Sequence, residues 1–282
     1  MLRATREVRA LRPSEREEAL DLCARNAAEN VYVAARLLEA DLSRSRGQLL
    51  AYCPDRRIEA LCWQSANIVP VECDAVAAAA FAARVRRQQS QFSSIFGPHE
   101  QVEAIWSRLR SWWREPLDIR QTQPLLALDA DTPLGVDPDP RLRPARLDEL
   151  DLIAPAAAAM FTEEIGYAPF TDPISRRGYW NTTRAIIERG HCLTIVEHGQ
   201  LLFKAEIGSV GIGACQIQGV WVDPQLRGRG LAAPAVAGVV AYARAHVAPL
   251  VTLYVNDYNL PALQTYRRVG FIRQGTFSTV LL

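Results

Sequence analysis

The chain lacks the features that mark membrane-spanning, disulfide-bonded and metal-binding proteins. No uninterrupted apolar run reaches the roughly 20 residues that a membrane-spanning helix needs. The N-terminal segment MLRATREVRALRP is charged and has no signal-peptide apolar core. The six cysteines are scattered, with neither a Cys-x-x-Cys pair nor a Cys/His ligand spacing. These absences predict a cytoplasmic protein with reduced thiols, no membrane association and no bound metal.

Net charge and lysine are also scarce. The formal net charge is +1, so no long-range field favours nucleic acid or an anionic membrane. The basic stretches ARVRRQ and RLRSWWRE lie on helical patterns, where solvated helix faces are the simpler interpretation. Among 32 basic residues Lys204 is the single lysine, which together with abundant alanine suggests a GC-rich coding genome. We expect no nucleic-acid partner.

The length of the chain and one segment rich in proline and aspartate predict two domains. A chain of 282 residues exceeds the usual single-domain size, and its 49% hydrophobic and 22% charged residues are ordinary for globular proteins. Residues 129–140, DADTPLGVDPDP, interrupt the apolar periodicity on both sides. The prediction is a first domain over 1–128, a linker over 129–140 and a second domain over 141–282.

Both halves show the same order of elements: strand, two helices, three strands, helix, strand, helix, strand. In the first half we expect a strand at 8–11, a helical stretch over 14–42, strands at 49–52, 58–64 and 68–72, a helix at 75–89, a strand at 93–96, a helix at 100–113 and a strand at 124–128. In the second half we expect a short strand at 142–144, helices at 147–165 and 175–189, strands at 192–197, 201–208 and 214–222, a helix at 231–246, a strand at 250–255, a helix at 260–269 and a strand at 271–281.

The order predicts two α/β domains in tandem, each with a mixed, mainly antiparallel sheet flanked by helices. The tripeptides Leu11-Arg12-Pro13 and Leu142-Arg143-Pro144 suggest a repeat with an offset of 131 residues.

The strongest local signal is VWVDPQLRGRGLAAPAVAGVV, which has an apolar strand, a turn with two glycines and an alanine-rich helix. Gly228 and Gly230 allow a sharp turn close to a ligand, and the free N–H groups of the following helix favour a phosphate. Arg227 and Arg229 add positive charge. The spacing fits neither a Walker loop nor a dinucleotide fingerprint. An arginine-rich surface turn is the alternative.

This segment resembles the signature of the GNAT superfamily of acetyl-coenzyme A dependent acyltransferases, Arg/Gln-x-x-Gly-x-Gly/Ala. The matching residues are Arg227, Gly228, Arg229, Gly230, Leu231 and Ala232. Upstream, Val220-Trp221-Val222-Asp223-Pro224 is similar to the family's preceding strand. Downstream, the family's helix and strand pattern is matched by Asn259, Ala262, Tyr266, Gly270 and Phe271.

The resemblance implies that acetyl-CoA is the co-substrate. The strand Val220-Trp221-Val222 would pair with the pantetheine arm, with a backbone N–H near Val222 meeting the oxyanion. Asn259 would hydrogen-bond the arm, and Tyr266 would be the general acid beside the sulfur. Helix capping by Asn259 and a plain core position for Tyr266 are the structural alternatives.

The resemblance does not extend to the general base, because some family members have a glutamate where this chain has Gln216. Glu206 on the preceding strand could act through water, and Glu163 or Glu164 could face the acceptor. The segment 162–180 would form one wall of the acceptor site, with Tyr167 and Trp180, and also Phe170 and Tyr179, as lining residues. Solvated carboxylates and ordinary loop packing are the alternatives.

The first half has no glycine at the corresponding position, IVPVECDAVAAAAFAARV, and Glu72 and Asp74 add negative charge there. It therefore looks like a degenerate copy, as in actinobacterial tandem-GNAT proteins. The overall prediction is an N-acetyltransferase acting on a primary amine of a small molecule or peptide, as a monomer or homodimer. A coenzyme-binding sensor without turnover is the alternative.

Overall fold

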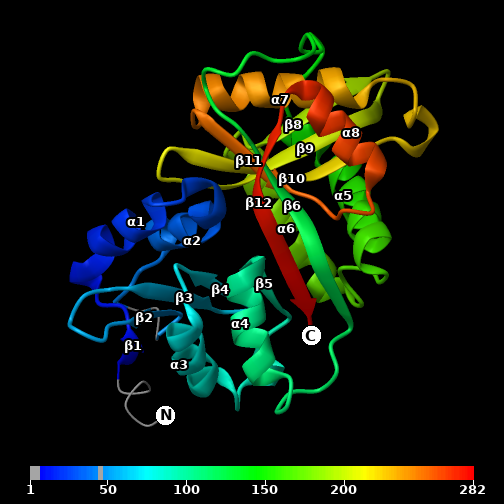
Figure 1. Ribbon diagram of the computed structural model, residues 1–282. Helices are drawn as coiled ribbons and strands as arrows, with labels where there is room; N and C mark the ends of the chain where they lie inside the picture. Colours follow the sequence, from blue (N-terminus) through cyan, green and yellow to red (C-terminus); the bar gives the residue numbers. More distant parts are fainter. Residues whose placement is uncertain (1–6, 44–46) are drawn as a thin grey trace.

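The two halves of the chain join in one twelve-stranded mixed sheet with helices on both faces (Figure 1). The computed structural model describes residues 7–43 and 47–282; residues 1–6, which begin the charged N-terminal segment, lie outside the described residues. None of the described helices is both long and apolar enough to cross a membrane. The predicted fold class, a mixed sheet with flanking helices, is confirmed.

The described residues of the first half form six strands and four α-helices in the predicted order. They are β1 (Val8–Ala10), α1 (Arg16–Ala24), α2 (Ala27–Glu39), β2 (Leu49–Tyr52), β3 (Ala60–Gln64), β4 (Asn67–Val71), α3 (Ala75–Val85), β5 (Ser94–Pro98), α4 (His99–Leu109) and β6 (Asp118–Leu128).

The second half repeats this order. Its elements are β7 (Arg143–Pro144), α5 (Leu150–Ile165), α6 (Pro173–Glu188), β8 (Cys192–Glu197), β9 (Gln200–Gly211), β10 (Ala214–Val222), α7 (Ala232–His246), β11 (Leu250–Tyr254), α8 (Leu260–Val269) and β12 (Ile272–Leu281).

The last strand of each half is exchanged between the halves. The sheet order is β1-β2-β3-β4-β5-β12-β6-β11-β10-β9-β8-β7. Strand β6 of the first half therefore lies between β11 and β12, and β12 of the second half lies between β5 and β6. Figure 1 shows β6 and β12 running side by side through the middle of the molecule. Each half completes its own sheet with a strand from the other.

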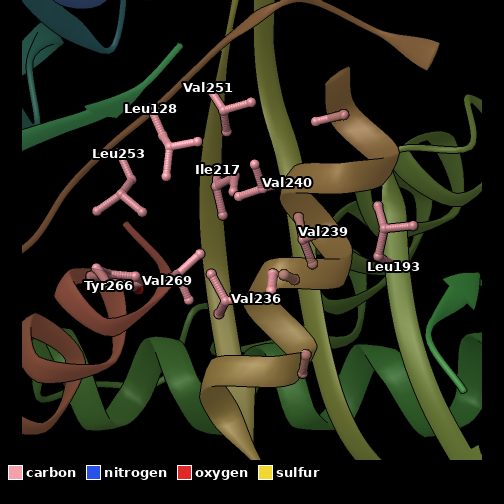
Figure 2. Close-up of a cluster of buried hydrophobic side chains, with 14 of the residues drawn as sticks. Leu128, Leu193, Ile217, Val236, Val239, Val240, Val251, Leu253, Tyr266 and Val269 are labelled. Atoms are coloured by element: carbon pink, nitrogen blue, oxygen red, sulfur yellow. The ribbon is translucent and has the colours of Figure 1, made fainter. Parts of the chain in front are cut away.

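The exchanged strands carry apolar side chains into both cores. Leu126 and Leu128 of β6 pack with α7 and α8 of the second half, and Val280 of β12 packs with α3 and α4 of the first. Figure 2 shows Leu128 beside Leu253 and Val251 in the second-half core. Because apolar burial is the main favourable term in folding, the halves stabilise each other through these strands.

An arginine–glutamate fork opens both halves and gives the register of the repeat. Arg9 donates two hydrogen bonds of 2.7 Å to the Glu15 carboxylate, and Arg143 pairs in the same two-pronged way with Glu149. Both arginines precede their glutamates by six residues, and the offset between the pairs is 134 residues. The tripeptide offset of 131 was therefore wrong, because it aligned Arg12, which does not form the fork, with Arg143.

Some element boundaries differ from the sequence-based ones. Strand β6 begins at Asp118 rather than 124, because the backbone of its first half pairs with β12 although most of its side chains there are exposed. The helical stretch over 14–42 is two helices, since Asn26 leaves the helical conformation and caps α2 by accepting a hydrogen bond from the N–H of Glu29. Helix α4 ends at Leu109, four residues before the predicted end.

Candidate functional site

Strands β10 and β11 run parallel but pair over only part of their length. Their register runs from Ala214 opposite Leu250 to Gln216 opposite Thr252, after which both strands continue unpaired with each other. We call this unpaired stretch the split. Gly219 lies in it at φ 59°, within an irregularity in the pairing of β10 with β9. The split leaves an edge of β10 available to an extended ligand.

The backbone of β10 turns one predicted residue toward the split. The N–H of Asp223 donates to Leu202 on β9, on the opposite side. Because backbone groups alternate in direction along a strand, those of Val222 face the split, whereas Val220 lies inside the register shift between Gln218 and Trp221. The Trp221 side chain instead packs with the cluster under α5 and α6.

A glycine turn joins β10 to α7 at the end of the split. Gly228 and Gly230 have φ values of 75° and 85°, and no atom of the described residues lies within 4 Å of where a Cβ would be. Leu231 precedes α7 without a side-chain cap from the described part of the chain. The first N–H groups of α7, including that of Ala232, are therefore open to an anion. Arg229 is exposed beside them.

Arg227 connects this turn with the end of α5. Its Nη2 lies 2.9 Å from the Glu163 carboxylate, and its Nε donates to the carbonyl of Val222 at 3.2 Å. Both side chains of the ion pair are about half exposed, so it contributes little to stability. Glu163, expected at the acceptor, therefore contacts the predicted phosphate loop.

The corresponding place in the first half is filled by the protein itself. The Asp74 carboxylate accepts hydrogen bonds from the N–H groups of Val76 and Ala77, at 2.9 and 2.8 Å, at the start of α3. Across β4 and β5, the ring of Pro70 lies 3.6 Å from where a Cβ of Gly97 would be. A second phosphate at α3 would have to displace a capping carboxylate of the same charge.

Tyr266 lies at the edge of the second-half core (Figure 2). Its ring is buried and meets Phe271 edge to face at 5.8 Å. Its hydroxyl has no hydrogen-bond partner among the described residues. Part of the hydroxyl oxygen remains accessible to solvent. Burial, with a smaller contribution from Glu164, raises the pKa of Tyr266, so the hydroxyl stays protonated at neutral pH.

Asn259 caps α8. Its side-chain oxygen accepts a hydrogen bond from the N–H of Ala262 at 3.2 Å. The residue is exposed, so its side-chain amide group can still donate to a ligand. Its predicted contact with a coenzyme stays a prediction.

The single lysine of the chain is buried against Glu206. Lys204 Nζ donates to Glu206 Oε1, and the lysine has no exposed surface. Both side chains lie next to Gly219, since a Cβ there would approach Lys204 Nζ and Glu206 Oε2 to 3.2 Å. The pair therefore lies directly beside the irregular part of β10, where the split opens. Burying two charges is costly, so this pair must stay matched.

The predicted acceptor residues separate into two groups. Trp180 donates to Asp151 near the beginning of α5, whereas Glu163 and Glu164 are at its end, roughly 18 Å away at 1.5 Å per residue. Tyr167 follows α5 and packs edge to face with Phe161.

Tyr179, which the sequence predicts as a lining residue of the acceptor site, has a raised pKa. Burial, with Glu206 as a second cause, raises the pKa of Tyr179 to about 12. It also packs with Phe170 and Trp180.

Two residues near the site were not selected from the sequence. Arg120 of β6 contacts Glu164, and Gly219 gives Lys204 and Glu206 their space. Arg120 carries no motif, and its contact spans 44 residues, so local patterns could not reveal it. Lys204 did carry a signal, because it is the only lysine.

No three His, Cys, Asp or Glu side chains of the described residues are placed to hold a metal ion.

Comparison with protein families divides the chain into two matched segments. Residues 157–271 match the Acetyltransferase (GNAT) family, and residues 47–153 match a Domain of unknown function (DUF4081). A search of curated proteins gave no match. The C-terminal half of this chain thus carries a domain of the GNAT family of acyltransferases. The domain of unknown function precedes it.

Solved structures share the fold along nearly the whole chain. A GNAT-family acetyltransferase from Colwellia psychrerythraea is similar with a TM-score of 0.57 at 10% identity, covering 98% of this chain and 99% of that one. A GCN5-related N-acetyltransferase from Sphaerobacter thermophilus gives 0.58 at 18% identity, covering 97% and 95%. A tandem GNAT protein from the clavulanic acid biosynthesis pathway gives 0.54 at 14% identity, covering 97% of each chain. At these identities the likeness shows the fold.

Replacing Gly230 by valine should weaken acetyl-CoA binding by more than about tenfold, because a β-branched residue disfavours φ 85° and would rearrange the turn. Isothermal titration calorimetry measures the affinity. The matched control is Gly213→Val, at φ 71° with equally open space, in the turn at the other end of β10. Equal affinity in both variants would contradict the loop assignment.

Proposed function

We propose that the protein transfers an acetyl group from acetyl-CoA to a primary amine of a small molecule or peptide. The observation that carries the proposal is the meeting of three features: the split beside β10, the uncapped N-terminus of α7 after two glycines, and the Tyr266 hydroxyl on α8. Each matches one part of an acyl coenzyme, namely the extended arm, the phosphates and the reacting sulfur.

The residues at the turn fit the phosphates. The space beside Gly228 and Gly230 is open, and the α7 N–H groups carry the positive end of the helix dipole. The backbone of Val220 and Val222 can pair with the amides of a pantetheine arm, with Trp221 holding the strand from its other face. Arg227 and Arg229 supply charge, with Leu231 and Ala232 closing the turn. The proposal therefore needs no metal.

Acetyl transfer requires a base, a donor to the carbonyl oxygen and an acid from the protein. Acetyl-CoA would supply the activated acetyl group as a thioester. Glu206 would accept a proton from the acceptor ammonium through water, which leaves a neutral amine as nucleophile. A backbone N–H of β10 near Val222 would stabilise negative charge on the carbonyl oxygen. As the C–N bond forms and the C–S bond breaks, Tyr266 would give its proton to the departing sulfur and regain one from the acylated nitrogen; burial keeps its hydroxyl protonated before the reaction.

Carboxylates would face the cationic acceptor at the end of α5. Glu164 is half exposed, and one of its oxygens has no partner among the described residues. Glu163 would become free to face the acceptor when a phosphate takes over Arg227. Tyr167 would contribute from the following loop, while Trp180 supports Tyr179 beside Glu206.

A sensor without turnover is the second candidate. Two features favour it: Gln216 cannot act as a base, and Glu206 already holds a charged partner in Lys204. Against it, Glu206 Oε2 lies beside Gly219 at the split, and the hydrogen bond from Lys204 goes to the other oxygen, Oε1. The two candidates agree on binding and differ on turnover.

Titration with acetyl-CoA should give one site per chain, because Asp74 occupies the equivalent helix start in the first half. An amine screen that detects released thiol should then find turnover. Two sites per chain would contradict the role of Asp74. Binding without thiol release across amines would favour the sensor, and absence of binding would reject both candidates.

Tyr266→Phe should lower kcat by about 100-fold with acetyl-CoA affinity nearly unchanged, since the buried ring remains and only the acid is lost. In the wild type, kcat should not fall on the alkaline side up to about pH 10, because the pKa of Tyr266 is raised above its usual value near 10. Tyr242→Phe, which removes a hydroxyl bonded to the Gly190 carbonyl, is the control. Full activity of Tyr266→Phe would remove Tyr266 as the acid.

Glu206→Gln should lower kcat by about 100-fold and also destabilise the fold by about 3–5 kcal/mol, because Lys204 is left buried without a counter-charge. The double variant Lys204→Met/Glu206→Gln separates these effects. It should recover most of the unfolding free energy, measured in urea, without recovering kcat. A double variant with wild-type kcat would show that Glu206 is structural.

A further inference from the structure

Arg120 is a buried arginine of the first half that reaches the GNAT half. It lies on β6, opposite Thr279 of β12, and its side chain is 7% exposed. Its Nη2 donates to the backbone carbonyl of Glu164 at 2.7 Å, and its Nη1 donates to Glu164 Oε1 at 3.3 Å. Its Nε donates to Asp118 on its own strand. Two of the three contacts therefore hold one residue of α5.

The position of this contact on α5 gives it a mechanical role. The carbonyl of Glu164 is among the last four of the helix, which have no partner within the helix. A cation there also complements the negative end of the helix dipole. Helix α5 ends one residue later, at Ile165, and the following Gly166 adopts φ 90°. Arg120 thus holds the last turn of α5 through both the backbone and the side chain.

The last turn of α5 lies across the end of the split. Glu163 contacts Arg227 beyond β10, and the next residue, Glu164, contacts Arg120 beyond β11. Burial is the main cause that raises the pKa values of Tyr254 and Tyr266, and the charge of Glu164 is a smaller cause. The pair with Arg227 is exposed at both partners, whereas Arg120 is enclosed. The firm attachment of this turn is therefore the one made by the first half.

We propose that Arg120 is a positioning residue that holds Glu164 at the acceptor side of the split. By this contact the first half, which has no open phosphate loop of its own, completes the active site of the second half. Arg120 touches neither co-substrate; it acts through Glu164 and the end of α5. The inference rests on the proposed function, because it assigns Glu164 to binding the ammonium of the acceptor.

The test compares Arg120→Ala and Arg120→Lys with Asp118→Asn in the full chain. Asp118→Asn removes the charge of the Arg120 partner that lies away from α5. We expect Arg120→Ala to lower kcat/KM for the acceptor amine by about 10- to 100-fold, mainly through the acceptor KM, because small misplacements of a binding group are costly. The affinity for acetyl-CoA should stay within about twofold, and Asp118→Asn should resemble the wild type.

Arg120→Lys keeps the charge but cannot bond the carbonyl and the carboxylate with one planar fork, so its effect should be intermediate. It also provides the test if Arg120→Ala does not fold. Combining Arg120→Lys with Glu164→Gln should give less than the product of the single effects, because both disrupt one contact.

Hydrogen exchange provides a readout that needs neither coenzyme nor acceptor. Amides over residues 161–167 should exchange faster in Arg120→Ala than in the wild type or Asp118→Asn. Unchanged exchange over 161–167, unchanged acceptor kinetics, or an equal loss of acetyl-CoA affinity would overturn the inference. A wild-type protein that binds no acetyl-CoA would instead reject the proposed function, with the exchange result still deciding whether Arg120 anchors α5.

Discussion

Strands β6 and β12 pair with each other along most of their length, and this pairing joins the two halves of the molecule into one sheet. Strand β6 also hydrogen-bonds to β11, and β12 to β5, so the two strands close both halves of the sheet at once. Neither half contains, in its own sequence, the strand that completes its sheet. The halves are therefore coupled through backbone hydrogen bonds and shared cores, which couple them more strongly than a surface contact would.

The coupling explains how two halves with one architecture can differ in function. Both begin with the same arginine–glutamate fork and continue through the same order of elements. They diverge at the turn before the third helix of each half, where the second half has Gly228 and Gly230 and the first has Asp74 capping α3. A cap worth about 1 kcal/mol stabilises the helix but also occupies the place of an anion. The first half retains the fold and supports the second.

Charge is placed sparingly around the proposed reaction centre. Lys204 and Glu206 form a buried pair beside Gly219, whereas Arg120 is buried and its partner Glu164 is half exposed. Buried charges tolerate little displacement, because separating them leaves an unpaired ion in a medium of low polarity. The buried cations Lys204 and Arg120 therefore hold the carboxylates of Glu206 and Glu164 in defined positions, which is what an acceptor site for an amine requires. By contrast, Arg227 and Glu163 are exposed and can exchange partners at little cost.

The sequence by itself determined the local features: the order of elements in both halves, the glycine turn before α7, and the absence of such a turn in the first half. These depend on hydrophobic periodicity, on φ values that glycine alone adopts easily, and on charges adjacent in the chain. The tertiary structure decided the exchange of β6 and β12, the burial of Lys204, the contact of Arg120 with α5, and the separation of Trp180 from Glu164. Those features join residues far apart in the chain, and strand pairing at long range depends on how whole faces and edges fit together. Local composition does not encode that fit. The sequence-based prediction of β6 is therefore too short, and the predicted repeat is three residues out of register.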